Sequence, residues 1–115
     1  MEILTCEKRF LKQVDDFLED ISQQLEEIMD ENTVVDDVNY SSGVLKLDFN
    51  SSEGKKTYVL NKQAPNKQLW LSSPFSGPQR YEFDLISKQW INNRSHVNII
   101  DLLNDEFKSH FELDQ

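Results

Sequence analysis

A cluster of carboxylates near the start of the chain is the densest group of side chains that could do chemistry. It includes Asp15, Asp16, Glu19, Asp20 and Glu27, many of which stand three or four residues apart. An α-helix would place such residues side by side, so their charges would repel. Carboxylate oxygens suit hard cations such as Fe²⁺, Mn²⁺, Ca²⁺ and Mg²⁺, which relieve that repulsion. The spacing favours either a solvated helix face that keeps the protein soluble or a weak cation site.

A second group of polar residues surrounds Trp70. The alternation predicts that Leu69 and Leu71 point toward the core and that Trp70 points the other way. The same outward face is expected to carry Lys46, Asp48, Asn61, Gln68, Ser72, Arg80 and Glu82. Trp and Arg dominate the binding energy of protein interfaces, and amides add hydrogen bonds without burying a charge. The pattern therefore predicts a protein-binding surface, and the alternative is a tryptophan that packs on a loop or a neighbouring side chain.

The element that carries the carboxylates is predicted by the apolar residues between them. These recur at three- and four-residue steps: Ile3, Phe10, Val14, Phe17, Leu18, Ile21, Leu25 and Ile28. On a helical wheel they fall within an arc of about 120°. We therefore expect a long amphipathic helix from near Ile3 or Leu4 to about Glu31. Any cation ridge should lie in its later turns, because the first turns of the polar face carry three bases.

The middle of the chain changes to the period of two that is typical of strands. Short strands are expected at residues 44–49, 57–61, 68–72, 80–83 and 88–91. Because short turns join them, consecutive strands should pair antiparallel. Asn98 can cap a final helix whose core positions are Ile99, Leu102, Leu103, Phe107 and Phe111. The predicted fold is α+β, a two-layer α-β sandwich in which about five antiparallel strands carry the N- and C-terminal helices on one face.

Length and charge limit the classes of protein that fit. The 115 residues suit one domain over 1–115. A net charge of −9 disfavours nucleic acids and anionic membranes as partners. The charge is polarised, since residues 1–37 carry 12 acids and 3 bases whereas residues 38–100 carry 4 acids and 8 bases. Cys6 is the single cysteine, so no intrachain disulfide can form. No apolar run of membrane-spanning length is found, and any targeting segment is expected to be missing or already removed.

One long segment resembles a known family. Residues 57–81, TYVLNKQAPNKQLWLSSPFSGPQRY, are similar to the signature of frataxins, and to the eukaryotic members more than to most bacterial ones. Gly43-Val44-Leu45 before the segment, Trp90 after it and the acidic first helix follow in the expected order, so the resemblance spans nearly the whole chain. It implies an α-β sandwich, a role in mitochondrial iron-sulfur cluster assembly, and weak binding of iron (Fe²⁺/Fe³⁺) on an acidic ridge.

The resemblance also implies which residues carry these roles. The partner-binding residues would be Asn61, Gln63, Asn66, Gln68, Trp70 and Arg80. The iron ridge would be formed by Asp16, Asp20 and Glu27, with Asp15, Glu19 and Asp37 nearby. Other ridge positions of the family are not acidic here, namely Lys8, Lys12, Gln23 and Gln24. A high iron stoichiometry is therefore not expected.

Three functions are compatible with these residues. The leading hypothesis is a regulator without catalytic residues, which binds a cysteine desulfurase and its iron-sulfur scaffold protein and accelerates persulfide transfer. The alternative is an iron chaperone or a weak ferroxidase, an activity attributed to the family, although His96 and His110 lie far from the carboxylates in sequence. The third is an acidic adaptor that binds a basic partner through the first helix. The resemblance implies the mitochondrial matrix or a mitochondrion-derived organelle, and we expect a monomer when the chain is alone.

Overall fold

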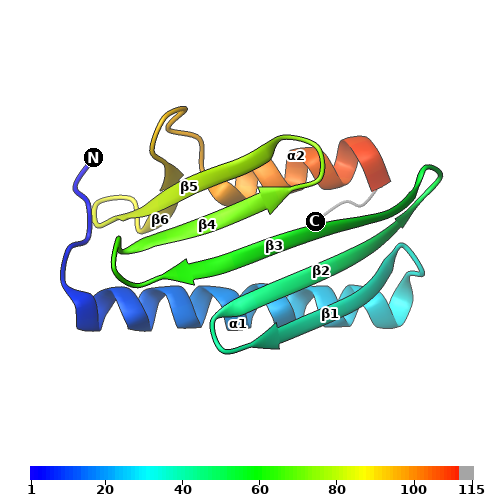
Figure 1. Cartoon of the computed structure of the whole chain (residues 1–115), viewed down its shortest axis with the longest axis horizontal. Coiled ribbons are helices and arrows are strands. Elements are labelled where there is room, and N and C mark those ends of the chain that lie inside the picture. The colour runs from blue at the N-terminus through cyan, green and yellow to red at the C-terminus, as the bar shows by residue number, and fades with distance from the viewer. Residues whose placement is uncertain (112–115) are drawn as a thin grey trace.

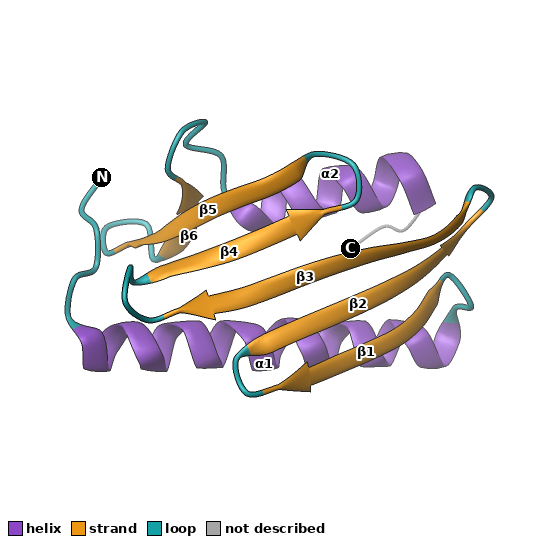
Figure 2. Ribbon diagram, in the orientation of Figure 1, coloured by secondary structure: helices purple, strands orange, loops and turns teal. Residues whose placement is uncertain are grey.

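The computed structural model describes residues 1–111, and the end of the expected 1–115 domain, residues 112–115, lies outside the described residues. Two helices flank six strands (Figures 1 and 2). The elements are α1 (Glu7–Glu31), β1 (Val35–Ser41), β2 (Val44–Ser51), β3 (Gly54–Gln63), β4 (Gln68–Ser73), β5 (Gly77–Asp84), β6 (Gln89–Asn92) and α2 (Ile99–Phe111).

The sheet is an antiparallel meander in which every strand pairs with its neighbours in sequence, in the order β1-β2-β3-β4-β5-β6. Both helices lie behind this sheet in Figure 1, so they cover one face and leave the other open. The predicted two-layer α-β sandwich with an antiparallel sheet and terminal helices on one face is therefore confirmed.

The sheet has six strands where about five were predicted, because β1 was not among the predicted strands. Its inner residues break the period of two. Val38 and Tyr40 alternate, but Val35 is out of phase with them, because the pairing register of β1 and β2 shifts between Val35 and Asp37. A bulge adds a residue to one strand and so moves the apolar position by one. The bulged strand still buries Val35, which is 2% exposed.

The predicted start of the first helix is also wrong, whereas its end at Glu31 is correct. The helix begins at Glu7, because the preceding residues pair with the end of β5 instead. The Leu4 N–H donates to the Phe83 carbonyl (2.9 Å), and the Leu85 N–H donates to the Glu2 carbonyl (2.7 Å). Backbone hydrogen bonds to the sheet thus replace the helical ones, while the Leu4 side chain is still buried.

The core lies between the helices and the inner face of the sheet. Phe10, Val14, Leu18 and Leu25 of α1 are at most 1% exposed, as the predicted apolar arc requires. The Asn98 Oδ1 accepts the Ile100 N–H (2.8 Å), which confirms the predicted cap of α2. The inner strand residues include Leu45, Leu47, Phe49, Tyr58, Leu60, Leu69, Leu71 and Tyr81. Leu69 and Leu71, which were predicted to point toward the core, are therefore in it.

A carboxylate interrupts this core where α2 crosses the strands. Glu106 is 8% exposed. Its Oε1 accepts hydrogen bonds from the Tyr58 hydroxyl (2.8 Å) and the Ser73 hydroxyl (2.6 Å), and its Oε2 accepts one from the Ser76 hydroxyl (2.6 Å). Burial, followed by the nearby Glu106 carboxylate, raises the pKa of the Tyr58 phenol far above its usual value. The phenol therefore stays a hydrogen-bond donor, and the network links α2 to β3, β4 and the β4–β5 turn.

The N-terminal segment is held by a second buried carboxylate, and its protonation should weaken the fold. The Ser87 hydroxyl and the Glu2 N–H donate to Asp84, and these bonds hold its pKa well below the usual 3.8. The unfolded chain therefore takes up this proton at a higher pH than the folded chain does. We expect the free energy of unfolding to fall as the pH drops below about 4. Urea unfolding followed by circular dichroism across this range measures the slope.

The matched variant for this prediction is Asp84→Asn. It lacks the charge and should have a lower free energy of unfolding than the wild type at neutral pH. This difference between the two proteins should become smaller as the pH falls. Equal acid slopes for the two proteins would show that other carboxylates cause the acid sensitivity.

A candidate protein-binding face and the acidic ridge

Four residues form a row across the open face of the sheet. Val44, Asn61, Trp70 and Arg80 are consecutive register partners on β2, β3, β4 and β5. Side chains of directly opposed residues project to the same face about 5 Å apart. Their neighbours Leu69 and Leu71 are at most 1% exposed on the helix side. The prediction that Trp70 points away from the helices is therefore confirmed.

The indole of Trp70 is held on this face by two polar neighbours. Its Nε1–H donates to the Gln68 Oε1 (2.9 Å), and the Arg80 guanidinium lies 4.7 Å from the ring centroid. A guanidinium over an indole is an attractive cation-π contact that also fixes the orientation of both groups. Trp70 is half-buried and Arg80 is exposed. The pair therefore offers an oriented aromatic ring and unused N–H donors to solvent.

The amide residues predicted for partner binding lie close to this pair. Gln63 and Gln68 are register partners where β3 and β4 end and begin. Both share the face of Trp70, because each lies two residues from a member of the row. Asn66 is exposed in the turn between the strands, where the Lys67 N–H donates to the Ala64 carbonyl (3.2 Å). The structure thus brings Asn61, Gln63, Asn66, Gln68, Trp70 and Arg80 together on the open face and its adjoining turn.

The outward face is less polar and less open than expected at two positions. Asp48 points outward, but it is only 7% exposed, and its Oδ1 accepts a hydrogen bond from the Thr57 hydroxyl (2.6 Å). Val44 adds an apolar end to the row and is 38% exposed. The face therefore carries an exposed valine and a half-buried tryptophan among polar side chains, rather than a uniformly hydrophilic surface.

A pocket of about 630 Å³ adjoins the row, and part of its lining was not predicted. Asn92, Asn93 and Arg94 enter it from the end of β6 and the loop before α2. The alternation of strand residues gave no signal for them, because a residue in a turn has no fixed face. The only hint in the sequence was that Arg94 belongs to the basic middle segment of the chain.

The carboxylates of α1 lie along its exposed side, but several are paired. Asp16 forms an ion pair with Lys12 (2.9 Å), and the Asp20 Oδ2 accepts a hydrogen bond from Gln24 (3.1 Å). The Asp15 Oδ1 lies 3.0 Å from the Nζ of Lys62 on β3. The Lys62 side chain reaches Asp15 by crossing Gly43, which has a φ of +78° and where a Cβ would lie 2.9 Å from the Lys62 Cε. The basic middle segment thus neutralises part of the acidic first segment.

The other ridge residues are dispersed. Glu19 and Glu27 are exposed on α1, whereas Asp37 is exposed on β1 and is the register partner of Asp48. Asp37 therefore projects from the sheet rather than from the helix. Among residues 1–111, no three His, Cys, Asp or Glu side chains lie close enough together to hold a metal ion. This arrangement can attract cations electrostatically, but it offers no enclosed coordination shell.

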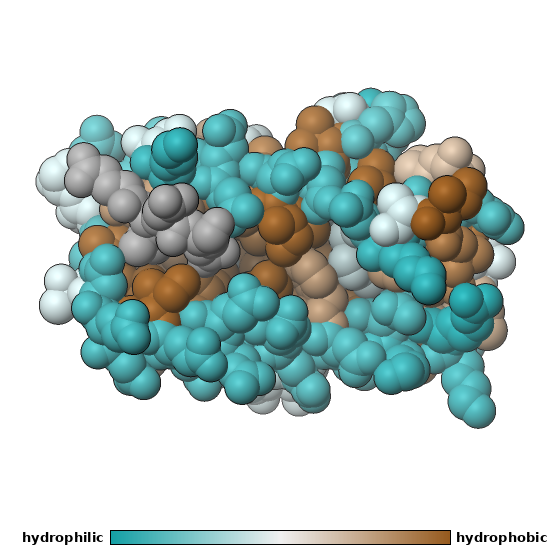
Figure 3. All heavy atoms as spheres, turned by 180° about the vertical axis from the view of Figure 1, so that it is seen from behind, coloured by the Kyte–Doolittle hydropathy of each residue, from teal (hydrophilic) through white to brown (hydrophobic). Residues whose placement is uncertain are grey.

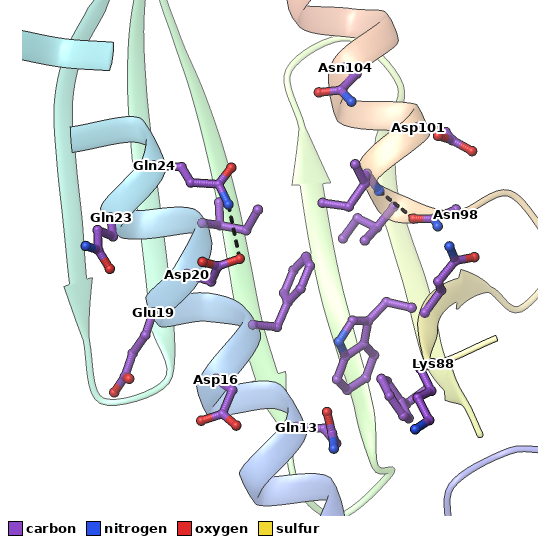
Figure 4. A pocket seen from close by; sticks show the side chains of 17 residues that line it. Gln13, Asp16, Glu19, Asp20, Gln23, Gln24, Lys88, Asn98, Asp101 and Asn104 are labelled. Atoms are coloured by element: carbon purple, nitrogen blue, oxygen red, sulfur yellow. Dashed lines mark hydrogen bonds between the residues drawn. The ribbon is translucent and has the colours of Figure 1, made fainter. Parts of the chain in front are cut away.

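A groove of about 980 Å³ separates α1 from α2 on the opposite side of the molecule (Figures 3 and 4). Figure 4 shows Asp16, Asp20 and Gln24 on one wall and Asn98, Asp101 and Asn104 on the other. Trp90 lines its floor and is 3% exposed, packed edge-on against Phe10 (5.9 Å between centroids) and Phe83 (5.2 Å). The two tryptophans thus differ in role, since Trp90 belongs to the core and Trp70 to the open face.

Comparison with known proteins identifies the family. The sequence model described as "Frataxin-like domain" matches residues 4–113. The chain belongs to the frataxin family. A frataxin homologue of Schizosaccharomyces pombe is 40% identical over 98 residues, which cover 84% of this chain and 60% of that protein. A Caenorhabditis elegans frataxin is 43% identical, and the matched region covers 68% of that protein. The region matched in a Saccharomyces cerevisiae homologue covers 55% of that protein. This chain therefore spans little more than half the length of some of its relatives.

Solved frataxin structures share the fold. A trimeric frataxin from Saccharomyces cerevisiae superposes with a TM-score of 0.74 at 37% identity, covering 88% of this chain and 80% of that one. A second structure of the trimeric yeast protein, described as complexed with ferrous, gives a TM-score of 0.72 at 36% identity over 95% of this chain and 88% of that one. The curated relatives named above are all described as mitochondrial. Neither helix within residues 1–111 is long and apolar enough to cross a membrane.

Proposed function

We propose that this frataxin is an accessory protein of mitochondrial iron-sulfur cluster assembly. It binds the complex of a cysteine desulfurase and its scaffold protein through the open face and accelerates persulfide transfer to the scaffold. The observation that carries the proposal is the row of Asn61, Trp70 and Arg80, an oriented aromatic and cationic group on a sheet face that no helix covers. The mitochondrial relatives and the family resemblance support the same partner class.

The open face suits a binding role better than a catalytic one. Around Trp70 its polar groups are the amides of neighbouring Asn and Gln side chains and the permanently charged guanidinium of Arg80. Such groups donate and accept hydrogen bonds without exchanging protons near neutral pH. The proposed action is positional. Trp70, with Asn66 and Gln68, enters the scaffold beside the cysteine that receives sulfur, and its contacts favour the conformation in which that cysteine is accessible.

The direct test is a sulfur-transfer assay with the matching desulfurase and scaffold pair. Adding this chain is expected to speed persulfide formation on the scaffold cysteine, measured by mass spectrometry after quenching. The same mixture of desulfurase and scaffold without this chain should form the scaffold persulfide at the slower rate. The proposal fails if saturating amounts of the chain leave the transfer rate unchanged.

Iron handling is the second candidate, and one comparison favours it specifically. The yeast relative has been solved in complex with ferrous iron. In this chain Asp16, Asp20 and Glu27 could bind Fe²⁺ weakly as cargo, with Asp15, Glu19 and Asp37 adding negative potential. The variant Asp16→Lys with Asp20→Lys separates the two candidates in the same assay. If this variant abolishes acceleration at constant Fe²⁺ while a Trp70 variant retains it, delivery of iron becomes the better explanation.

A further inference from the structure

The pocket beside Trp70 contains two arginines without carboxylate partners. The ion pairs within residues 1–111 are all formed by lysines, and neither Arg80 nor Arg94 takes part in them. The pocket lining includes no acidic residue, although the chain has 21 of them. In a molecule of net charge −9, the pocket is therefore a local concentration of positive charge.

Arg94 is held against the sheet although it lies in a loop. The Asn92 side chain, on a residue only 8% exposed, accepts the backbone N–H groups of Arg94 (2.8 Å) and Ser95 (3.0 Å) through its Oδ1. The Asn93 N–H donates to the Arg80 carbonyl on β5 (3.0 Å). The loop backbone is therefore fixed directly beside the strand that carries Arg80, and Arg94 lines the same pocket as Arg80.

The chemistry of this pocket selects a carboxylate. The indole fixes the plane of the Arg80 guanidinium, and a guanidinium binds a carboxylate through two parallel N–H donors in its plane. The second guanidinium at Arg94 and the amides of Asn61 and Asn93 supply further donors. A volume of about 630 Å³ is ample for an acidic side chain. A nucleic acid would bring many charges toward an acidic molecule, whereas one carboxylate meets only the local positive site.

We propose that Arg80 and Arg94 form a clamp for an Asp or Glu side chain of the partner protein, and that Arg94 is a further specificity-determining residue of the binding face. The identity of the partner rests on the function proposed above, but the clamp itself does not. An acidic anchor on the partner would enter beside the Trp70 ring, so that aromatic contact and charge pairing are made by adjacent groups.

The clamp is tested first on the protein alone, with succinate as the probe. In ¹H-¹⁵N spectra, succinate should shift the Nε–H signals of Arg80 and Arg94 and the indole N–H of Trp70, while the indole N–H of the buried Trp90 stays fixed. Arg94→Gln should weaken this binding about fivefold. Uniform small shifts, or unchanged binding in Arg94→Gln, would overturn the clamp.

The second test uses the desulfurase-scaffold complex and a matched charge control. Arg94→Glu should weaken binding about tenfold or more and reduce its salt dependence. Lys108→Glu makes the same charge change on the exposed side of α2 and should have a much smaller effect. An Asp or Glu to Lys change at the contacting partner residue should restore binding of Arg94→Glu. Equal effects of the two substitutions, with Trp70→Ala still harmful, would refute the clamp and leave the proposed function intact.

Discussion

Replacing Trp70 by alanine is expected to weaken binding to the desulfurase-scaffold complex by about 2 kcal/mol, or roughly thirtyfold. The substitution removes the largest side chain of the row and the surface on which the Arg80 guanidinium rests. It also leaves the Gln68 Oε1 without its indole donor. Titration of the complex by surface plasmon resonance or calorimetry gives the affinity, and the sulfur-transfer rate at subsaturating concentration should fall in parallel.

Two control variants separate anchoring from general surface effects. Trp70→Phe keeps a ring beneath Arg80 but removes the N–H donor, so it should retain more affinity than Trp70→Ala. Ile86→Ala truncates another exposed apolar residue, which is 71% exposed in the turn between β5 and β6, and should bind normally. The temperature of thermal unfolding should change little in all three variants, because Trp70 and Ile86 both lie outside the core. Wild-type affinity of Trp70→Ala would rule out the proposed binding face.

Replacing Glu106 by alanine is expected to lower the free energy of unfolding by about 3 kcal/mol. Three hydroxyl groups lose their acceptor, and the bond from Tyr58 lies in a buried region. Unpaired buried donors cost more than the hydrogen bonds themselves contribute, because they cannot return to water. Urea unfolding with a two-state fit measures the change.

The controls for this variant lie on the same helix. Glu106→Gln keeps the shape and one carbonyl acceptor, so it should lose about half as much stability. Asp105→Ala removes an exposed carboxylate one residue earlier and should change stability by no more than about 0.5 kcal/mol. If Glu106→Ala behaves like Asp105→Ala, the network contributes nothing. After correction for the unfolded fraction, all three should bind the partner complex normally.

The parts of the fold that follow a regular period could be predicted from the sequence. The 3.6-residue period of α1 located its buried face and its end, and the period of two separated the outward Trp70 from the inward Leu69 and Leu71. These predictions succeed because apolar residues recur on the buried face of a helix or strand with the period of that element. The family resemblance added the roles of these residues, which no periodicity contains.

The features that depend on distant contacts could not be predicted. The bulge at the start of β1 moves Val35 out of phase, so a periodic pattern does not reveal the strand. The residues before α1 are apolar at helical spacing, yet hydrogen bonds to Phe83 and Leu85, some eighty residues away, decide their conformation. Arg94 lines the binding pocket from the loop before α2. Lys62 on β3 forms an ion pair with Asp15 on α1. Each of these depends on tertiary pairing rather than local sequence.

The two edges of the sheet have a consequence for colloidal behaviour. The β1 edge carries the charged Asp36, paired with Lys55 (3.1 Å), next to a register shift that bends the strand. The opposite edge, β6, is only four residues long and bridges to Asn98. Charge, distortion and shortness all hinder the addition of a strand from another molecule. The folded protein should therefore resist amyloid-like stacking even where it is concentrated, and the open face that carries Trp70 stays available to its partner.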